Sequence, residues 1–227
     1  MGPGQGCRGE QQLFDHMSIQ QAYTDWSTTY DADPNRTRDL DQSVTRQVLG
    51  RARRRSVLEL GCGTGKNTVY LAEISDRVRS LDFSEGMLAE ARTKVGASHV
   101  TFAAADLTVP WPFENGAADL VVGNLVLEHI EHLPHIFAEA ARCLAPDGRL
   151  FLSELHPFRQ YQGTQANFQR GQQTTQIPAF THNVSDYLTA AEAAGLQLAA
   201  LEEWWHTDDA GKPPRLITFL FRKAATA

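Results

Sequence analysis

The sequence predicts an α/β protein whose mostly parallel β-sheet has helices on both faces and ends in an antiparallel hairpin. An apolar, β-prone stretch at residues 57–60 leads into three alternate glycines, and a helical pattern follows. Strand-like and helical stretches then alternate as far as residue 155, which favours parallel strands joined by crossover helices. Near the C-terminus two strand-like stretches are separated by only a turn, so as neighbours they must pair antiparallel.

The composition favours a single soluble domain. The chain has 227 residues, of which 42% are hydrophobic and 21% are charged, and this length suits one full hydrophobic core. A net charge of −6 argues against a broad nucleic-acid-binding surface. Its three cysteines lack the spacing of a metal site or a disulfide framework, so we expect a reduced, cytoplasmic setting. No apolar stretch approaches the roughly 20 residues of a membrane span, and we expect no membrane partner.

The N-terminal region is expected to precede the sheet as helices. Residues 1–12 are rich in Gly and Gln and are predicted to be poorly ordered. Residues 13–30 form a polar, helical stretch with aromatic side chains, and a turn follows at residues 33–35. Residues 37–49 carry apolar side chains on one side of a second helix.

The central region supplies the alternating strands and helices. Ser84 has the position of an N-cap, and Pro134 opens a later helix. The expected strands are residues 57–60, 77–81, 100–104, 119–123 and 149–155. The expected helical stretches are residues 66–74, 84–95, the residues from 125 onward, and 134–144.

The C-terminal region departs from this alternation. Residues 157–178 contain seven glutamines with little periodicity, and a loop of this length is usually functional or mobile. A helix is predicted at residues 184–194, and the two final strands at residues 196–206 and 215–223.

The glycine-rich turn indicates a nucleotide-like ligand, because glycines let the backbone approach a ligand and a helix N-terminus offers unpaired N–H groups. Gly61, Gly63 and Gly65 do not have the spacing of a dinucleotide fingerprint, whose third glycine would fall on Lys66 or Thr68. A P-loop would need glycine five residues before the Gly-Lys pair and Ser or Thr after it, and neither is present.

Residues 59–65, with the sequence ELGCGTG, resemble instead the first motif of class I S-adenosylmethionine-dependent methyltransferases. The resemblance spans roughly residues 55–155, with four motifs in the family's order. It implies a Rossmann-like, seven-stranded sheet in a single domain over residues 13–227. Within that domain, residues 13–50 would form a helical lid, 55–155 the cofactor-binding core, and 156–206 the acceptor-side loop, helix and strand.

Asp82 lies 17 positions after Gly65, at the end of the second predicted strand, where its carboxylate can accept both hydroxyls of a ribose. The side chains of Phe83 and Met87, which follow Asp82, could flank the adenine of such a ligand. The resemblance implies that Asp106 meets the adenine amino group and that Glu59 lies near the methionyl ammonium. It also implies that Gly61 and Gly63 give backbone contacts. The full set expected to bind S-adenosylmethionine is Tyr30, Glu59, Gly61, Gly63, Gly65, Asp82, Phe83, Met87, Asp106, Leu107 and Asn124.

Methyl transfer from a sulfonium is an in-line displacement that needs no covalent enzyme intermediate, so the protein aligns the acceptor, excludes water and, where needed, removes a proton. The candidate bases are His156, His129, Tyr161 and His182. His156 leads because it directly follows the fifth strand, and its replacement by Ala is predicted to lower turnover more than cofactor binding.

A metal site is a weaker alternative. The pair Glu128-His129 resembles that of quinone-precursor O-methyltransferases that hold a divalent ion, but those enzymes carry a further Glu where this chain has Leu125. We therefore expect no metal.

The acceptor is expected to contact residues 13–30 and 156–206, which are rich in aromatic side chains and amides. These features favour methylation of an O or N atom of a small, aromatic or heteroaromatic metabolite, with S-adenosylhomocysteine as product, by a monomer or homodimer. A catalytically idle nucleotide-binding protein, a methyltransferase acting on a macromolecule and an NAD-dependent oxidoreductase are the alternatives. The aromatic residues in the later segment are Phe158, Tyr161, Phe168, Phe180, Tyr187, Trp204 and Trp205.

Overall fold

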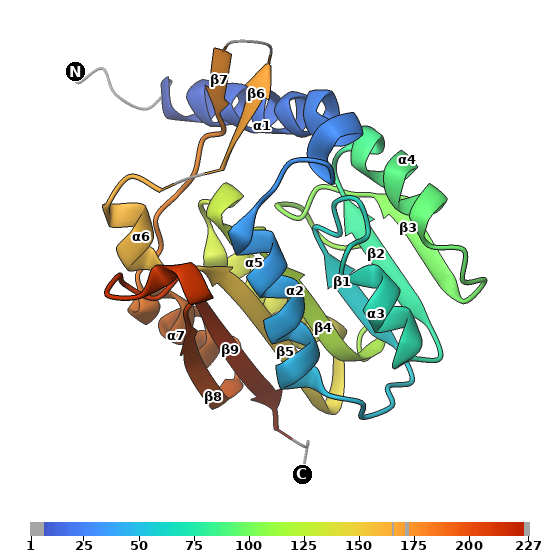
Figure 1. The fold of residues 1–227 in the computed structure, drawn as a ribbon. Coiled ribbons are helices and arrows are strands. Elements are labelled where there is room, and N and C mark those ends of the chain that lie inside the picture. Colours follow the sequence, from blue (N-terminus) through green and yellow to red (C-terminus); the bar gives the residue numbers. More distant parts are fainter. Residues whose placement is uncertain (1–6, 165, 171–172, 225–227) are drawn as a thin grey trace.

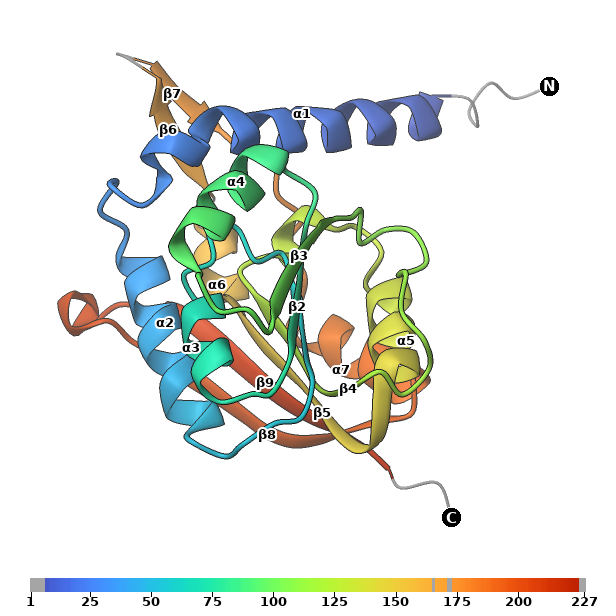
Figure 2. The same cartoon turned by 90° about the vertical axis from the view of Figure 1, so that its right-hand side faces the viewer.

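The computed structural model describes residues 7–164, 166–170 and 173–224, and it has three layers (Figure 1). A seven-stranded sheet lies between two layers of helices, with α2, α3 and α4 on one face and α5 and α7 on the other (Figure 2). Helix α1 crosses above the end of the sheet where the parallel strands terminate (Figures 1 and 2). None of the described helices combines the length and the apolar character needed to cross a membrane.

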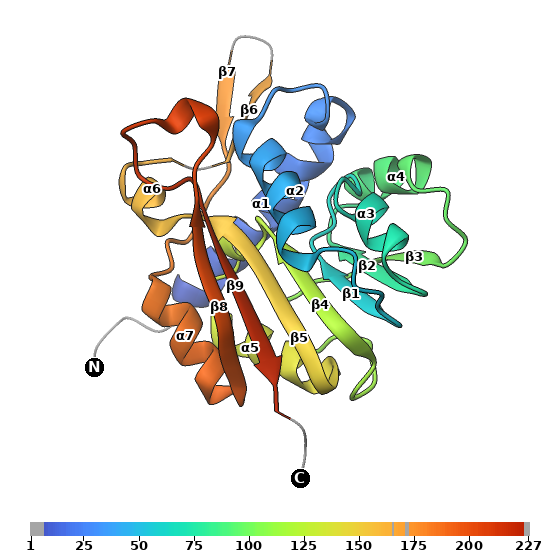
Figure 3. The ribbon, with the colours of Figure 1, turned by 60° about the horizontal axis from the view of Figure 1, so that its bottom comes forward.

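The order of strands in the sheet is β3-β2-β1-β4-β5-β9-β8. The first five in this order are parallel, and β9 joins β5 and β8 in antiparallel register, so the predicted fold class is confirmed. Figure 3 shows the hairpin of β8 and β9 beside β5. The strands of the sheet are β1 Val57–Leu60, β2 Val78–Asp82, β3 Val100–Ala104, β4 Ala118–Asn124, β5 Leu144–Leu155, β8 Leu196–Trp204 and β9 Leu216–Lys223.

Helices α2, α3, α4, α5 and α7 begin within two residues of the positions that the sequence indicates. The Ser84 hydroxyl accepts a hydrogen bond from the Met87 N–H, as an N-cap does, and the Asn35 side chain caps α2 in the same way. The helices are α1 Cys7–Tyr30, α2 Arg36–Leu49, α3 Thr68–Glu73, α4 Glu85–Lys94, α5 Leu133–Cys143, α6 Pro157–Tyr161 and α7 Val184–Ala193, with short 3₁₀ helices η1 Leu127–His129 and η2 Thr207–Asp209.

Alternation along the buried strands divides the core into two clusters. In β4, Val121 faces the cluster that includes α5 and α7, whereas Leu120 and Val122 face the cluster that includes α2 and α3. Successive side chains of a strand point to opposite faces, so a strand covered on both faces is apolar throughout. This burial fixes the sheet and therefore the positions at which its strands end.

The segment after β4 differs from the prediction. Instead of a helix from Leu125, the backbone turns at Leu125 with φ of 52° and continues as η1. The Glu154 carboxylate accepts hydrogen bonds from the N–H groups of Val126 and Leu127, which fixes this turn to β5. This turn carries His129 toward the end of the sheet.

The segment expected to be an irregular loop also contains regular structure. Pro157 begins α6, and β6 (Asn167–Arg170) pairs antiparallel with β7 (Gln173–Gln176) in a separate two-stranded ribbon. At the other end of the chain, α1 already begins at Cys7, so residues 7–12 are helical, whereas residues 1–6 lie outside the described part.

A buried carboxylate ties the C-terminal hairpin to α6. Both oxygens of Asp209 accept from the Arg215 guanidinium, at 2.7 and 2.8 Å, and Arg159 of α6 lies 3.1 Å from one of them. The Asp209 side chain is fully buried. Arg215 also donates to the Thr37 hydroxyl of α2, so this cluster connects three separate segments.

We predict that Asp209→Asn lowers the free energy of unfolding by about 3 kcal/mol, because two arginines lose their buried counter-charge. The Arg215 and Arg159 guanidinium groups hold the pKa of Asp209 well below its usual range. The stabilisation by the Asp209 carboxylate is therefore present above the pKa that this group has in the unfolded chain, and it is lost as the pH falls below about 4. Denaturant titrations of the wild-type protein and of Asp209→Asn test this: the difference between their free energies of unfolding should be smaller at pH 3 than at pH 7.

Asp208→Asn is the matched control, because Asp208 pairs with Arg36 at the surface with more than half of its side chain exposed. It should change stability by less than about 0.5 kcal/mol. Equal effects of the two substitutions would contradict the role given to Asp209.

Candidate functional site

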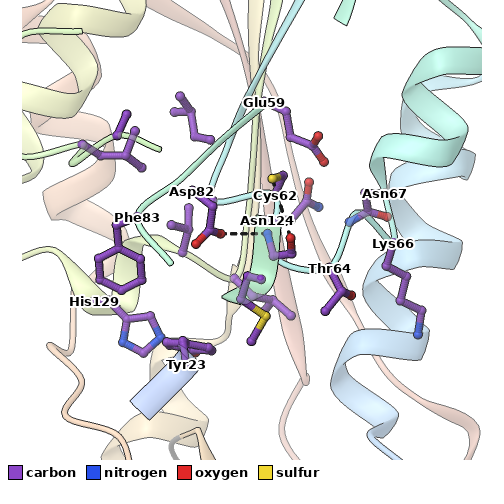
Figure 4. A pocket seen from close by; sticks show the side chains of 18 of the residues that line it. Tyr23, Glu59, Cys62, Thr64, Lys66, Asn67, Asp82, Phe83, Asn124 and His129 are labelled. Atoms are coloured by element: carbon purple, nitrogen blue, oxygen red, sulfur yellow. Dashed lines mark hydrogen bonds between the residues drawn. The ribbon is translucent and has the colours of Figure 1, made fainter. Parts of the chain in front are cut away.

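A pocket opens where β1, β2 and β4 end, beneath the C-terminal part of α1. The turn after β1, the ends of β2 and β4, the link after β3, and residues of α1 and α2 supply its lining. Figure 4 shows two distinct ends: Thr64, Lys66 and Asn67 lie at one, whereas Phe83, His129 and Tyr23 lie at the other. The pocket is thus polar at one end and aromatic at the other.

The glycine turn takes a conformation that other residues rarely adopt. Gly61, Gly63 and Gly65 all have positive φ, from 53° to 79°. A Cβ at Gly61 would lie 2.4 Å from the Val126 side chain, whereas a Cβ at Gly63 would meet no atom within 4 Å. Gly61 therefore allows the turn to pack against the segment after β4, and the space at Gly63 leaves its backbone accessible.

Asp82 connects the end of β2 to this turn. Its carboxylate accepts hydrogen bonds from the Gly63 N–H at 2.8 Å and the Ser84 N–H at 2.9 Å. Burial raises the pKa of Asp82 to about 6, although these backbone donors favour the charged form. A carboxylate offers about four acceptor positions, so two remain for the hydroxyls of a ligand.

Glu59 also lines the pocket, but its Oε2 already accepts from the hydroxyls of Thr68 and Ser80, at 2.6 and 2.7 Å. Burial raises the pKa of Glu59 to about 7. Two of the roughly four acceptor positions of this carboxylate, both on Oε2, are therefore used within the protein.

The aromatic end combines α1 with the end of β2 and with η1. The Tyr23 ring lies 6.3 Å from the Phe83 ring and 5.2 Å from the His129 ring, measured between centroids. Trp26 stacks against Tyr23, and Tyr30 meets Trp26 edge-on. Flat apolar surfaces of this kind suit the faces of an aromatic ligand.

Tyr23 and His129 form a hydrogen-bonded pair inside this end of the pocket. The Nδ1 of His129 lies 3.1 Å from the Pro178 carbonyl oxygen, which can only accept, so Nδ1 carries the proton in the neutral ring. The Tyr23 hydroxyl then donates to Nε2 at 2.7 Å. Burial raises the pKa of Tyr23 well above its usual value, which keeps this hydroxyl protonated near neutrality.

Polar contacts hold α1 and the link to α2 over the pocket. The Asp31 carboxylate accepts from the Thr64 hydroxyl at 2.8 Å and pairs with Lys94 of α4 at 2.5 Å. The Gln20 amide donates to the Phe83 carbonyl oxygen. The N-terminal helices are thus fixed to the glycine turn and to α4.

Of the residues expected to bind the cofactor, all except Gly65 line the pocket. A Cβ at Gly65 would lie 3.2 Å from Ala91 and Val95, so Gly65 instead allows α4 to pack closely. Asp106 and Leu107 follow β3, and Asn124 ends β4, as the motif order implied.

Of the four candidate bases, only His129 lines the pocket. His156 accepts from the Phe158 N–H through Nδ1, so its Nε2 donates to Glu203 and both ring nitrogens are engaged. His182 is buried against the carbonyl oxygens of Leu127 and Ile130. Tyr161 is exposed and donates to Asn183. The leading position given to His156 therefore lacks a geometric basis here.

The described aromatic side chains that were expected on the acceptor side do not line this pocket. Among the described residues between 156 and 206, none lines this pocket. Tyr187 stacks on Phe219 in the core, and Phe158 and Trp205 are about half exposed. The Phe168 side chain lies outside what the structure describes. This segment reaches the site through the Pro178 carbonyl oxygen and, next to it, the Phe180 N–H, which donates to the Glu128 carbonyl oxygen.

Arg38 and Asp41 of α2 also line the pocket, and neither was expected there from the sequence. Asp41 accepts from the amide groups of Asn67 and Asn124, each at 2.8 Å. The sequence did contain a signal for Asp41, because a charged residue on the buried side of an amphipathic helix needs hydrogen-bond partners. Its partners could be identified only from the fold.

Comparisons with known proteins find methyltransferases. A family model described as a methyltransferase domain matches residues 58–152. The chain is 28% identical over 243 residues to the uncharacterized methyltransferase AN0656 of Emericella nidulans, covering 88% of this chain and 84% of that protein. It is also 28% identical over 197 residues to the biotin biosynthesis bifunctional protein BioHC of Cellvibrio japonicus, covering 83% of this chain and 37% of that protein.

The chain spans from a quarter to about half the length of several other curated relatives. Among solved structures, the N-methyltransferase NodS of Bradyrhizobium japonicum in complex with S-adenosyl-L-homocysteine superposes with a TM-score of 0.66 at 18% identity. That match covers 92% of this chain and 98% of the other, and it shows a shared fold.

We predict that Gly61→Ala lowers the free energy of unfolding by about 2–4 kcal/mol, because the new Cβ overlaps Val126 and the residue must keep a positive φ. Gly63→Ala is the matched control, since it carries the backbone strain alone and should cost about 1–2 kcal/mol. Chemical denaturation measures both, and Gly61→Ala combined with Val126→Ala should recover part of the loss. A larger effect at Gly63 would show that the approach to Val126 is unimportant.

Proposed function

Because the chain belongs to the class I S-adenosylmethionine-dependent methyltransferase family, we propose that it transfers a methyl group from S-adenosylmethionine to an O or N atom of a small, aromatic or heteroaromatic acceptor. One observation carries this proposal: the Tyr23–His129 pair lies in the same pocket as Asp82 and the glycine turn. A proton acceptor and a nucleoside-binding carboxylate thus share one enclosed space. The expected second product is S-adenosylhomocysteine.

The bound cofactor supplies a methyl group already activated by its sulfonium centre. Asp82 would accept the ribose hydroxyls, and the side chains of Phe83, Met87 and Leu107 would contact the adenine. The space beside Gly63, where a Cβ would meet no atom within 4 Å, allows close approach of the cofactor. The role of the protein at the methyl group is alignment and exclusion of water.

The Tyr23–His129 pair would remove the acceptor's proton. The Tyr23 oxygen accepts the proton from the acceptor's O–H or N–H while its own proton moves to Nε2 of His129. The imidazolium that results keeps its Nδ1–H bond to the Pro178 carbonyl oxygen, and the Glu128 carboxylate lies 3.8 Å from Nε2.

An aromatic acceptor is favoured by the rings of Tyr23, Tyr30 and Phe83 around the pocket. The same proposal includes a cytoplasmic setting, a monomeric or homodimeric state, and no nucleic-acid or membrane partner. The cysteine spacing supports the cytoplasmic setting, and the net charge of −6 argues against a nucleic-acid partner. A catalytically idle protein on this fold would lack a reason to bury a Tyr–His pair beside the nucleoside site.

A methyl-transfer screen tests the function. The protein is incubated with S-adenosylmethionine labelled in its methyl group and with panels of phenols, aromatic amines, heteroaromatic compounds and, separately, carboxylic acids, proteins and RNA. Labelled product is expected from a member of the first three panels. Cofactor binding without transfer to any panel would favour the idle protein, and transfer only to protein or RNA would favour the macromolecular alternative.

We predict that Tyr23→Phe and His129→Asn each lower turnover by about 10²–10⁴-fold, the usual contribution of general acid–base catalysis. The affinity for S-adenosylhomocysteine, measured by calorimetry, should change by less than about threefold. The comparison variant is His156→Asn, which keeps an N-cap acceptor for α6 and should leave turnover nearly unchanged. A large loss in His156→Asn with full activity in His129→Asn would reverse these roles.

We predict that the affinity for S-adenosylhomocysteine falls as the pH drops below about 6, by up to about tenfold per pH unit. Burial raises the pKa of Asp82 to about 6, and a protonated carboxyl loses acceptor capacity for the ribose hydroxyls. Asp82→Asn should bind weakly without this slope. Glu59→Gln should keep the slope, and its disappearance there would assign the titration to Glu59.

A further inference from the structure

The segment 177–182 links β7 to α7 and contacts the elements that carry both members of the Tyr23–His129 pair. Ile177 is fully buried in an apolar cluster with side chains of α1, the helix that carries Tyr23. One residue further on, the Pro178 carbonyl oxygen lies 3.1 Å from Nδ1 of His129. The segment therefore reaches both partners of the pair, although none of its residues lines the pocket.

The turn that carries His129 is held largely by bonds to other segments. A short 3₁₀ helix such as η1 has few internal hydrogen bonds of good geometry, so its orientation depends on its neighbours. At the start of the turn, the Glu154 carboxylate of β5 accepts from two backbone N–H groups. Further along, the Phe180 N–H donates to the Glu128 carbonyl oxygen at 2.7 Å. The orientation of η1 therefore depends on β5 and on the segment 177–182.

His182 anchors the end of this segment to the same turn. Its Nε2 lies 2.8 Å from the Ile130 carbonyl oxygen and 3.2 Å from the Leu127 carbonyl oxygen. Carbonyl oxygens only accept, so Nε2 carries the proton and shares it between the two. The ring is buried and meets the Tyr187 ring edge-on. His182 thus does for carbonyl groups of this turn what Glu154 does for its N–H groups.

The bond from Nδ1 of His129 to the Pro178 carbonyl oxygen fixes the tautomer that a proton acceptor needs. While Nδ1 carries the proton, Nε2 offers its lone pair to the Tyr23 hydroxyl. Without the carbonyl oxygen, the proton would be free to move to Nε2, and Tyr23 would lose its acceptor. The position of the Pro178 carbonyl oxygen therefore decides whether His129 can accept a proton from Tyr23.

We propose that His182 is a positioning residue for methyl transfer: by holding the segment 177–182 on η1, it keeps the Pro178 carbonyl oxygen at Nδ1 of His129. This inference rests on the proposed function and deepens it, because it explains how the proton acceptor of that function keeps its tautomer. His182 does not line the pocket, so its effect passes through His129. This role differs from that of the base expected at His182 from the sequence.

Three substitutions at His182 separate its hydrogen bonds from the packing of its ring. His182→Gln places an amide N–H where Nε2 lies, since the two nitrogens are equally many bonds from Cα, and should keep the bonds to η1. His182→Asn places its amide at the position of Nδ1 and should lose those bonds. His182→Phe keeps a buried ring but has no donor.

His99→Phe is the matched control. Nε2 of His99 also lies 3.1 Å from a backbone carbonyl oxygen, that of Ala72. His99 comes just before the start of β3, at the end of the sheet opposite the pocket. The same change of side chain should therefore leave His129 as it is in the wild-type protein.

Nitrogen-15 NMR of the full chain, labelled at histidine and measured at about pH 8 so that an ordinary histidine is neutral, reports the tautomer of His129. The signals are assigned by their loss in His129→Asn. The wild-type protein, His182→Gln and His99→Phe should show His129 as the Nδ1–H tautomer. His182→Asn and His182→Phe should show a mixture of both tautomers.

Turnover gives a second readout, with the acceptor that the methyl-transfer screen identifies. His182→Asn and His182→Phe should lower turnover by roughly 10- to 100-fold, because a displaced catalytic group loses its alignment. Both variants should bind S-adenosylhomocysteine as tightly as the wild-type protein does. His182→Gln should retain both turnover and affinity.

An unchanged His129 tautomer in a folded His182→Asn or His182→Phe protein would overturn the proposal, and so would equal behaviour of His182→Gln and His182→Asn. If only His182→Gln folds, His182 supports the fold as a whole, and the proposal is overturned as well. The expected NMR pattern without methyl transfer to any panel would support the positioning of His129 and contradict the proposed function.

Discussion

The hydrogen bond from the Gly63 N–H to the Asp82 carboxylate joins the ends of β1 and β2, and the site is built around it. It requires a backbone with positive φ at the glycine turn and a buried carboxylate whose pKa is raised by desolvation. Gly61 brings the same turn against Val126, and the segment after Val126 carries His129. The position of Asp82, the proposed partner of the ribose, and that of the proposed proton acceptor thus depend on one turn.

The pocket separates two kinds of chemistry along its length. At the polar end, Asp41 of α2 accepts from the side-chain amides of Asn67 and Asn124. At the aromatic end, α1 contributes Tyr23 beside Phe83 and His129. Both helices come from the N-terminal region and are fixed to the body by Asp31, Thr64 and Lys94. The N-terminal helices therefore complete the site as well as cover it.

The fold was largely predictable, because parallel strands buried on both faces are apolar throughout and the glycine spacing is specific. The placement of Asp82, Asp106 and Asn124 around one pocket, at or after strand ends, was predictable for the same reason. The Tyr23–His129 pair was not, because the two residues are 106 positions apart and sequence position alone favoured His156. Arg38 and Asp41 were missed because a helical pattern shows which side is buried but not which distant amides or rings it meets.

The most direct test is a crystal structure of the protein with S-adenosylhomocysteine bound. The account predicts ribose hydroxyls within hydrogen-bond distance of Asp82 and a sulfur atom that faces an open space beside Tyr23 and His129. A bound nucleoside whose sulfur is separated from the Tyr23–His129 pair by protein atoms, or whose ribose does not contact Asp82, would contradict it.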